Sequence, residues 1–249
     1  MGLKDLVVSS LSSLPPRVLI YGPPGVGKTT LASRAPKPIL LDLENGAGYL
    51  DVPSIGCADC HEVRSVLIQL VEEEHTYQTV VIDSCSVLEK MIWDCVAESK
   101  GVDAIDDIGY GKGFGLALTY WHALLKRCNQ IRDQGVMPVL ICHGQVSRYE
   151  DPEHESFDRH SPRLHKSAAA ALVEWSDAAI YASFRTAVAR EDQGFGSVRK
   201  IGVGSGERVL RTNERPAYCA KNRMGLPDEM PMDQWPKQLR RRNENGKPK

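Results

Sequence analysis

A glycine-rich segment, GPPGVGKTT at residues 22–30, has residue types and a spacing that suit the binding of a nucleoside triphosphate. It fits the phosphate-binding pattern G-x-x-x-x-G-K-[ST] without a mismatch, after a predicted strand and before a predicted helix. There the backbone N–H groups curl around phosphate oxygens, and the positive end of the helix attracts anions. We expect Lys28 to reach the β- and γ-phosphates and the Thr29 hydroxyl to bind Mg²⁺; a chance glycine-rich turn is the alternative. The predicted nucleotide-binding residues are Gly22, Pro23, Pro24, Gly25, Val26, Gly27, Lys28, Thr29 and Thr30.

Two carboxylates follow other apolar runs. Asp83 ends the run TVVID, where a carboxylate can hold Mg²⁺ directly or through water. In many ATPases the next residue is a glutamate that polarises the attacking water, but here it is Ser84. Asp42 and Glu44 lie at the C-terminal end of the preceding run, residues 38–44, and ligands of open α/β sheets bind outside the carboxyl ends of the strands. Glu44 can therefore orient and deprotonate water beside Asp83; alternatively, it caps the turn NGAG.

Alternating elements must position these residues. Apolar runs without polar alternation, typical of strands buried on both faces, occur at residues 17–21, 38–44, 79–83 and 137–143. Helical stretches lie between and after them, at residues 28–34, 60–74, 86–100 and 115–134. This order predicts an α/β fold with a mostly parallel sheet flanked by helices. After residue 176, short runs between glycine-rich turns predict antiparallel strands added at the C-terminal edge.

Composition limits the class of protein. With 249 residues and 42% hydrophobic content, the chain can bury one large core. A formal net charge of −1 predicts no strong non-specific field, so any nucleic-acid contact must come from local patches. Seven cysteines, in no framework spacing, predict free thiols in a reducing compartment. No segment resembles a secretion signal or a membrane span, which predicts a cytoplasmic protein without a membrane partner.

The phosphate-binding loop, a second strand ending in D-x-E, and Asp83 without a following glutamate resemble the RecA-type recombinase core. More specifically, the chain resembles the phage-encoded RecA-like ATPases associated with single-strand annealing. This resemblance covers about residues 17 to 228, with its most specific matches at 109–114 (GYGKGF), 141–145 (ICHGQ), 158–181 and 221–227 (KNRMGLP). The AAA+ class normally carries Asp-Glu at the end of the aspartate strand, so Ser84 counts against that class.

The resemblance implies activity, partners and site residues. It implies an ATPase that uses ATP and Mg²⁺, acts on single-stranded DNA as a homo-oligomeric ring or filament, and has a single-strand DNA-binding protein as a further partner. Glu44 occupies the position of the catalytic glutamate. His143, or as second choice Gln145, matches the residue that senses the γ-phosphate; a structural histidine is the alternative. Lys221 and Arg223 match the cations that reach a neighbour's ATP site and stabilise the transferring phosphate; two solvated residues on an edge strand are the alternative.

Two segments occupy the positions of the DNA-binding loops of RecA-type proteins, at residues 101–115 and 147–166. Loops of this length in a compact domain are usually functional or disordered. Single-stranded DNA is held by cations along its backbone and by aromatic rings that stack on bases. The predicted DNA-binding residues are Tyr110, Lys112, Arg148, Tyr149, Arg159, Arg163 and Lys166. Acidic residues in the second segment leave it with little net charge.

The predicted organisation has three parts. Residues 1–16 form an N-terminal segment and candidate oligomerisation element, residues 17–228 form a RecA-like ATPase core, and residues 229–249 form a basic, disordered tail. The second candidate function is a RecA-like or AAA-type NTPase that acts as a motor or switch on protein partners, without a DNA substrate.

One further pattern is CADCH at residues 57–61. It matches a haem-attachment string, but covalent haem requires export, for which no signal is present. Cys57, Cys60 and His61, together with His75, are alternatively zinc ligands, although a structural zinc site usually has four clustered ligands. Free thiols at the start of a helix are the favoured interpretation.

Overall fold

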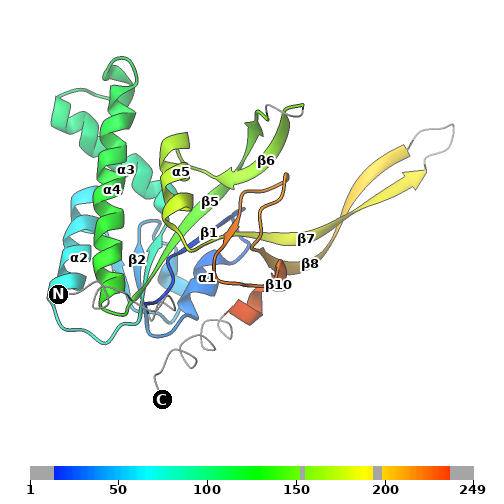
Figure 1. Ribbon diagram of the computed structural model, residues 1–249, viewed down its shortest axis with the longest axis horizontal. Helices are drawn as coiled ribbons and strands as arrows, with labels where there is room; N and C mark the ends of the chain where they lie inside the picture. The colour runs from blue at the N-terminus through cyan, green and yellow to red at the C-terminus, as the bar shows by residue number, and fades with distance from the viewer. Residues whose placement is uncertain (1–13, 152–154, 193–197, 236–249) are drawn as a thin grey trace, which may run out of the picture.

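A computed structural model describes residues 14–151, 155–192 and 198–235 and shows an α/β fold built on one twisted sheet (Figure 1). The strand order is β10-β8-β7-β1-β5-β4-β2-β3, with β6 paired to β5 and β9 paired to β7. The strands are β1 Val18–Gly22, β2 Pro38–Asp42, β3 Ser54–Gly56, β4 Thr79–Asp83, β5 Met137–Tyr149, β6 Phe157–Pro162, β7 Ala178–Asp192, β8 Val198–Arg211, β9 Lys221–Asn222 and β10 Glu229–Pro231. All pairs from β3 to β7 along this order are parallel. The β7–β8, β8–β10 and β7–β9 pairs are antiparallel, as predicted for the C-terminal edge. The β5–β6 pair is also antiparallel but was not predicted.

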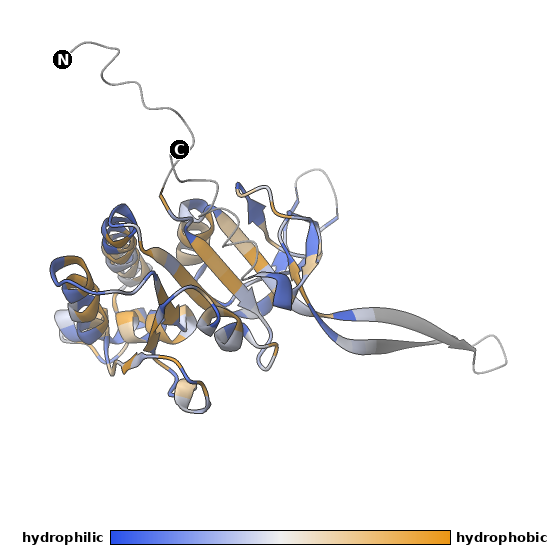
Figure 2. Cartoon of the chain, turned by 90° about the horizontal axis from the view of Figure 1, so that it is seen from below, coloured by the Kyte–Doolittle hydropathy of each residue, from blue (hydrophilic) through white to orange (hydrophobic). Residues whose placement is uncertain are grey.

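Helices cover both faces of the sheet. The α-helices are α1 Lys28–Ser33, α2 Cys60–Glu72, α3 Cys85–Lys100, α4 Lys112–Asp133 and α5 Lys166–Trp175, and the 3-10 helices are η2 Ala47–Tyr49, η3 Ile105–Asp107 and η4 Met232–Gln234. In Figure 1, α2, α3 and α4 stand together as one layer. Leu19 and Tyr21 of β1 are fully buried in the cluster that includes this layer, whereas Val18 and Ile20 are fully buried in the cluster that includes α1. Burial on both faces explains why the strand sequences are apolar without alternation, and these strands are coloured hydrophobic in Figure 2.

The expectation of a loop at residues 147–166 is wrong. β5 continues to Tyr149 and pairs antiparallel with β6, with Ser147 opposite Arg159. This part of the hairpin extends past the core, so neither of its faces needs apolar residues, and Val146 is 61% exposed. The expected loop at residues 101–115 is also shorter, because α4 already begins at Lys112.

The core extends beyond the predicted boundary at residue 228. β10 pairs with the end of β8 through Met230 opposite Leu210, and Trp235 is fully buried. Residues 229–235, predicted as part of a disordered tail, therefore belong to the folded core. Residues 1–13 and 236–249, which contain most of the predicted N-terminal segment and the rest of the tail, lie outside the described residues.

A two-stranded ribbon formed by β7 and β8 projects from the body of the molecule (Figures 1 and 2). At its base, β7 is parallel to β1 and contributes buried residues to the core. In the described part of the chain, no helix has the length and apolar character needed to cross a membrane.

Candidate nucleotide-binding site

The phosphate-binding loop joins β1 to α1, and close backbone packing positions it. A Cβ atom on Gly22 would lie 2.1 Å from the carbonyl oxygen of Ala182, so only glycine allows β7 to approach here. Gly27, with φ 95°, begins α1 from a left-handed conformation that glycine adopts without strain. The Lys28 ammonium folds back over the loop and donates to the carbonyls of Gly22 (3.0 Å) and Pro23 (2.9 Å). Lysine has three donors, so one remains for a phosphate.

The other loop residues divide between surface and core. Pro24 and Gly25 are exposed, and Gly25 has a φ of 74°. Val26 is fully buried and anchors the loop in the core. Thr30 lies half-buried in the first turn of α1, where its carbonyl accepts a hydrogen bond from the Ser33 hydroxyl. The loop therefore exposes backbone at its tip while its middle is held by apolar packing.

Thr29 and Asp83 bring oxygen atoms together at the end of β4. The Thr29 hydroxyl donates to Asp83 Oδ2 at 2.5 Å. Burial raises the pKa of Asp83, and the Thr29 hydrogen bond opposes that shift. Hydroxyl and carboxylate oxygens are ligands that Mg²⁺ prefers, so this pair fits a magnesium ion next to the phosphates.

Asp42, rather than Glu44, caps the turn after β2. Asp42 Oδ1 accepts from the backbone N–H groups of Glu44 (3.2 Å) and Gly46 (3.1 Å), and its Oδ2 accepts from Ala47 (2.9 Å). The alternative that Glu44 only caps this turn is therefore wrong. Asp42 is aligned with Asp83 on the neighbouring parallel strand, which places the residues after β2 beside the end of β4.

The Glu44 carboxylate instead faces the residue after β4 and a residue in the middle of β5. Its Oε1 accepts a hydrogen bond from the hydroxyl of Ser84 and lies 2.7 Å from His143 Nε2. Among the described residues no hydrogen bond engages Glu44 Oε2, so that oxygen is left to accept a proton from water. Burial lowers the pKa of Lys28, and the carboxylates of Asp83 and Glu44 oppose that shift. The lysine, the buried aspartate and the glutamate thus converge on one site.

His143 and Gln145 differ in their contacts. His143 ends the part of β5 aligned with β1, opposite Gly22, and contacts Glu44. Gln145 donates from Nε2 to the carbonyl of Pro162 across the hairpin at 3.2 Å. Of the two residues predicted to sense the γ-phosphate, only His143 contacts Glu44.

Two arginines lie at this site that the sequence argument did not assign to it. Arg163, predicted to bind DNA, adds to the lowering of the Lys28 pKa, and its N–H donates to the His143 carbonyl at 2.8 Å. Arg208 of β8 lies against the loop, because a Cβ atom on Gly27 would be 2.9 Å from its Nη1. Arg208 is exposed, so its guanidinium is accessible to a ligand. No local sequence pattern indicates that Arg208 lies here, because β8 is placed near the loop only by the order of strands in the sheet.

Lys221 and Arg223 lie at the opposite end of β1 from the loop. Lys221 of β9 is opposite Ala179 of β7, which is itself aligned with Leu19 near the start of β1. Its ammonium donates to the last carbonyls of α5, including that of Val173 at 3.0 Å. Within one subunit these cations are therefore remote from the phosphates, and their action on a neighbouring subunit stays a prediction.

The predicted DNA-binding residues fall into separate places. Tyr110 is fully exposed and Lys112 begins α4. Arg148 forms an ion pair with Asp158 at 3.7 Å on the hairpin. Of the other four, Arg163 lies at the nucleotide-binding site, as described above. The Arg159 guanidinium lies 4.8 Å from the Tyr149 ring centroid, and its side chain is only 12% exposed and pairs with Glu214. Lys166 begins α5 and is exposed.

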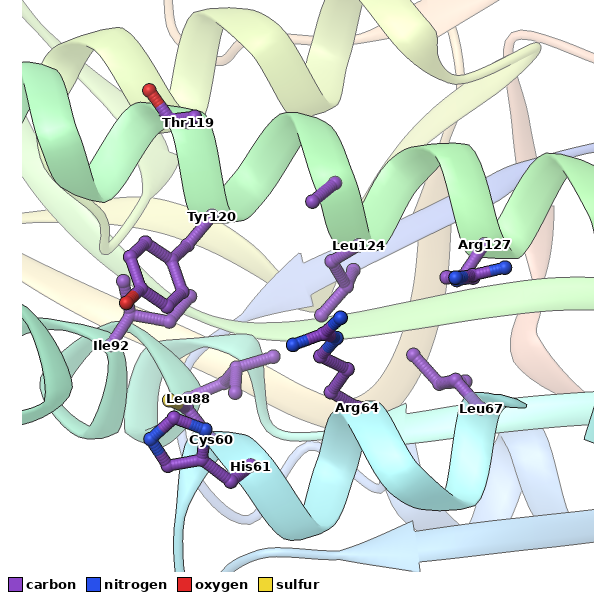
Figure 3. A pocket seen from close by; sticks show the side chains of 11 residues that line it. Cys60, His61, Arg64, Leu67, Leu88, Ile92, Thr119, Tyr120, Leu124 and Arg127 are labelled. Carbon is purple, nitrogen blue, oxygen red and sulfur yellow. The ribbon is translucent and has the colours of Figure 1, made fainter. Parts of the chain in front are cut away.

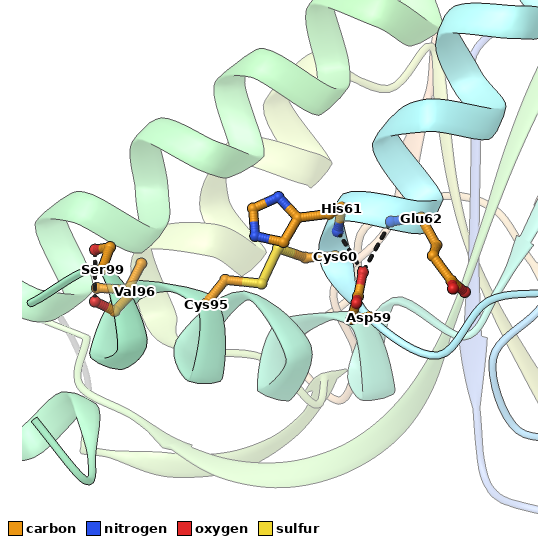
Figure 4. Close-up of a disulfide and its surroundings, with 7 residues drawn as sticks. All are labelled: Asp59, Cys60, His61, Glu62, Cys95, Val96 and Ser99. Carbon is orange, nitrogen blue, oxygen red and sulfur yellow. Dashed lines mark hydrogen bonds between the residues drawn. A yellow bond between two sulfur atoms is a disulfide. The ribbon is translucent and has the colours of Figure 1, made fainter. Parts of the chain in front are cut away.

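The expectation that all cysteines are free thiols is wrong. Cys60 at the start of α2 forms a disulfide with Cys95 of α3, 35 residues away, and the other five cysteines are free (Figure 4). Packing of α2 on α3 brings the two together, which spacing along the chain cannot indicate. The alternative zinc set of Cys57, Cys60, His61 and His75 is not assembled among the described residues, because the clustered ligand atoms belong to Cys60, His61 and Cys95.

Comparison with known families agrees with this geometry. A family model described as an AAA domain matches residues 14–224. The chain belongs to the AAA domain family. The argument from Ser84 against an AAA-type assignment therefore does not hold. This AAA domain is a P-loop NTPase domain, and nucleotide hydrolysis is the general activity of such domains. No curated protein matches the chain.

Proposed function

We propose that this AAA-domain protein hydrolyses ATP with Glu44 as general base and couples hydrolysis to the binding of single-stranded DNA, as in the RecA-like annealing proteins of phages. The observation that carries the catalytic half is the contact of Glu44 Oε1 with His143 Nε2 and the Ser84 hydroxyl. This contact holds a carboxylate beside Asp83, where a glutamate directly after that aspartate would act in many other ATPases.

Each residue of the site has a defined part in hydrolysis. Lys28 binds the β- and γ-phosphates, and Thr29 and Asp83 hold Mg²⁺, which neutralises phosphate charge when it is bound. Glu44 Oε2 orients the attacking water and accepts its proton. His143 Nε2 contacts the same carboxylate. We therefore expect a change at the γ-phosphate that shifts Glu44 to alter this hydrogen bond.

The hairpin of β5 and β6 provides the physical link to DNA. β5 runs without interruption from His143 at the site to Tyr149, a distance of roughly 20 Å at the usual rise of a strand. The returning strand is tied to the same point, because the Arg163 N–H donates to the His143 carbonyl. A displacement of His143 would therefore move both strands of the hairpin together.

Aromatic and cationic groups on exposed segments support a single-stranded DNA partner. Arg148 and Tyr149 lie on the hairpin, and Tyr110 and Lys112 lie beside the start of α4. Such groups bind DNA by phosphate contacts and base stacking. In the proposed ring or filament, Lys221 and Arg223 act on the ATP of a neighbouring subunit, and a single-strand DNA-binding protein is a further proposed partner.

A second candidate function is a motor or switch that acts on protein partners. The observation in its favour is also on the hairpin, where Arg148 is paired with Asp158 and where Val146 is 61% exposed. A neutralised, partly apolar surface suits a protein partner better than a phosphate backbone.

ATP turnover measured with and without a single-stranded oligothymidylate separates these candidates. Stimulation that is lost in a Tyr149→Ala, Arg148→Ala variant supports the coupling to DNA. A flat response together with no oligothymidylate binding rejects the DNA half, while turnover that depends on Glu44 would still support the ATPase half.

A further inference from the structure

A pocket of about 360 Å³ lies between α2, α3 and α4, in the helical layer on one face of the sheet (Figure 3). Buried side chains from two helices, Leu67 of α2 and Leu88 and Ile92 of α3, form its bottom. The half-buried side chain of Leu124 on α4 forms one wall. The interior of the pocket is therefore apolar, and its volume is in the range of small-molecule sites.

The wall at the start of α2 is covalently fixed. Cys60 lines the pocket and is joined to Cys95 of α3 by the disulfide. Asp59 caps α2 by accepting from the N–H groups of His61 and Glu62, both at 2.8 Å. The cap orders the first turn of α2, and the disulfide joins that turn to α3 at one wall of the pocket.

Two arginines lie on opposite sides of the pocket opening. Arg64 of α2 points across the pocket toward α4, which contributes Arg127 from the other side (Figure 3). Arg127 donates to Gln130 Oε1 at 2.8 Å, and no ion pair joins either arginine to a carboxylate in the described ranges. His61 and Tyr120 add further polar groups at one end. Two guanidinium groups next to an apolar interior, without acidic partners, are complementary to an anion with an apolar body.

We propose that this pocket binds a small amphipathic anion, with its aliphatic or aromatic body on Leu67, Leu88 and Ile92 and its carboxylate or phosphate paired with Arg64 and Arg127. Burial of the apolar body supplies affinity, and the paired guanidinium groups select against neutral molecules of the same size. None of the pocket residues belongs to the nucleotide-binding site, so this proposal does not depend on the proposed function.

The probe for the test is 8-anilinonaphthalene-1-sulfonate, an aromatic anion whose fluorescence rises in apolar sites. Decanoate, decyl phosphate and decan-1-ol are then used as competitors, which separates a carboxylate from a phosphate ligand and both from a neutral one. We expect saturable binding of one probe per chain. At least one anionic competitor should displace it at about tenfold lower concentration than the alcohol.

Matched variants locate the site. Arg64→Gln and Arg127→Gln should each weaken probe binding about tenfold, and Lys126→Gln, an exposed cation on the same helix, should leave it unchanged. Ala123→Trp should fill the opening and abolish binding, with thermal unfolding used to show that each variant is folded. Equal competition by decan-1-ol and both anions, or the same loss in Lys126→Gln as in the two pocket variants, would overturn the proposal.

Discussion

Glu44 Oε1 lies 2.7 Å from His143 Nε2, although the two residues are 99 positions apart in the sequence. The contact forms because β2 and β5 flank β4 in a parallel arrangement, so that the end of β2 and the point where β5 leaves the parallel sheet lie at one edge. It joins the proposed base to the strand that continues into the β5–β6 hairpin. One hydrogen bond therefore connects the proposed hydrolysis at Glu44 to the proposed movement of the β5–β6 hairpin.

Replacement of Glu44 tests the assignment of the base. Glu44→Gln should preserve the fold and ATP binding, because the amide is nearly isosteric and Lys28, Thr29 and Asp83 are unchanged. Steady-state hydrolysis should fall by roughly two orders of magnitude or more, as expected when a general base is removed. Glu74→Gln, at an exposed position beyond α2, is the matched control and should keep full turnover. Normal turnover in Glu44→Gln would place the base elsewhere.

Arg208 should contribute to nucleotide affinity from within the same subunit. Its guanidinium lies against Gly27 of the phosphate-binding loop, so Arg208→Ala should remove a charge-assisted contact with the bound phosphates. The Kd for a fluorescent ADP analogue should rise about tenfold. Arg215→Ala, which removes an exposed ion pair with Asp228, should leave the Kd unchanged. If both variants bind equally well, Arg208 has no role in nucleotide binding.

Mixing of subunits tests whether Lys221 and Arg223 act on a neighbour. A Glu44→Gln subunit keeps both cations, and a Lys221→Ala, Arg223→Ala subunit keeps the base. Mixed oligomers should therefore regain part of the hydrolysis that each variant lacks alone. Light scattering would verify that the two variants assemble together. Absence of recovery in verified mixed oligomers would exclude action between subunits and leave Lys221 as a structural contact of α5.

The Cys60–Cys95 bond makes a prediction about thiol content and stability. The denatured, unreduced protein should react with five equivalents of a thiol reagent, and the reduced protein with seven. A bond that closes 35 residues should contribute about 2–4 kcal/mol to the free energy of unfolding. Urea unfolding of Cys60→Ser, Cys95→Ser should show this loss, and Cys57→Ser in the oxidised protein serves as the control for thiol count. Seven reactive thiols without reductant would refute the bond.

Glu89 predicts a pH dependence of stability. Burial raises its pKa to about 7, while the hydrogen bond from the His165 N–H opposes that shift. Because the folded protein holds this proton more tightly than the unfolded chain, the stabilisation is complete at acidic pH and is lost as pH rises through 7. The loss should be at most about 3 kcal/mol.

Urea unfolding at pH 5 and pH 8 measures this effect. Glu89→Gln should remove this part of the pH dependence, because the amide remains neutral throughout the range. Glu98→Gln, exposed on the same helix, should retain the wild-type dependence. If the free energy of unfolding changes equally between pH 5 and pH 8 in the wild type and in Glu89→Gln, Glu89 does not titrate in this range.

The local sequence determined the elements and the phosphate-binding loop. Uninterrupted apolar runs predicted the central strands because both faces of those strands are buried, and glycine spacing followed by Lys28 and Thr29 predicted the loop between β1 and α1. Both signals come from residues close together in the sequence. Their types and spacing determine the local backbone conformation and which face of an element is buried. The position of Glu44 beside Asp83 was predictable for a related reason, since both lie at the carboxyl ends of parallel strands.

Only the tertiary structure decided which distant groups meet. Arg208 lies against Gly27, and Cys60 is bonded to Cys95. Asp42 caps the turn after β2, so the Glu44 side chain is available to contact His143. The hairpin was missed because it lies beyond the core, where no burial imposes an alternating pattern on its strands. Strand order and helix packing set these contacts, and both depend on how buried surfaces match across the whole domain rather than on spacing along the chain.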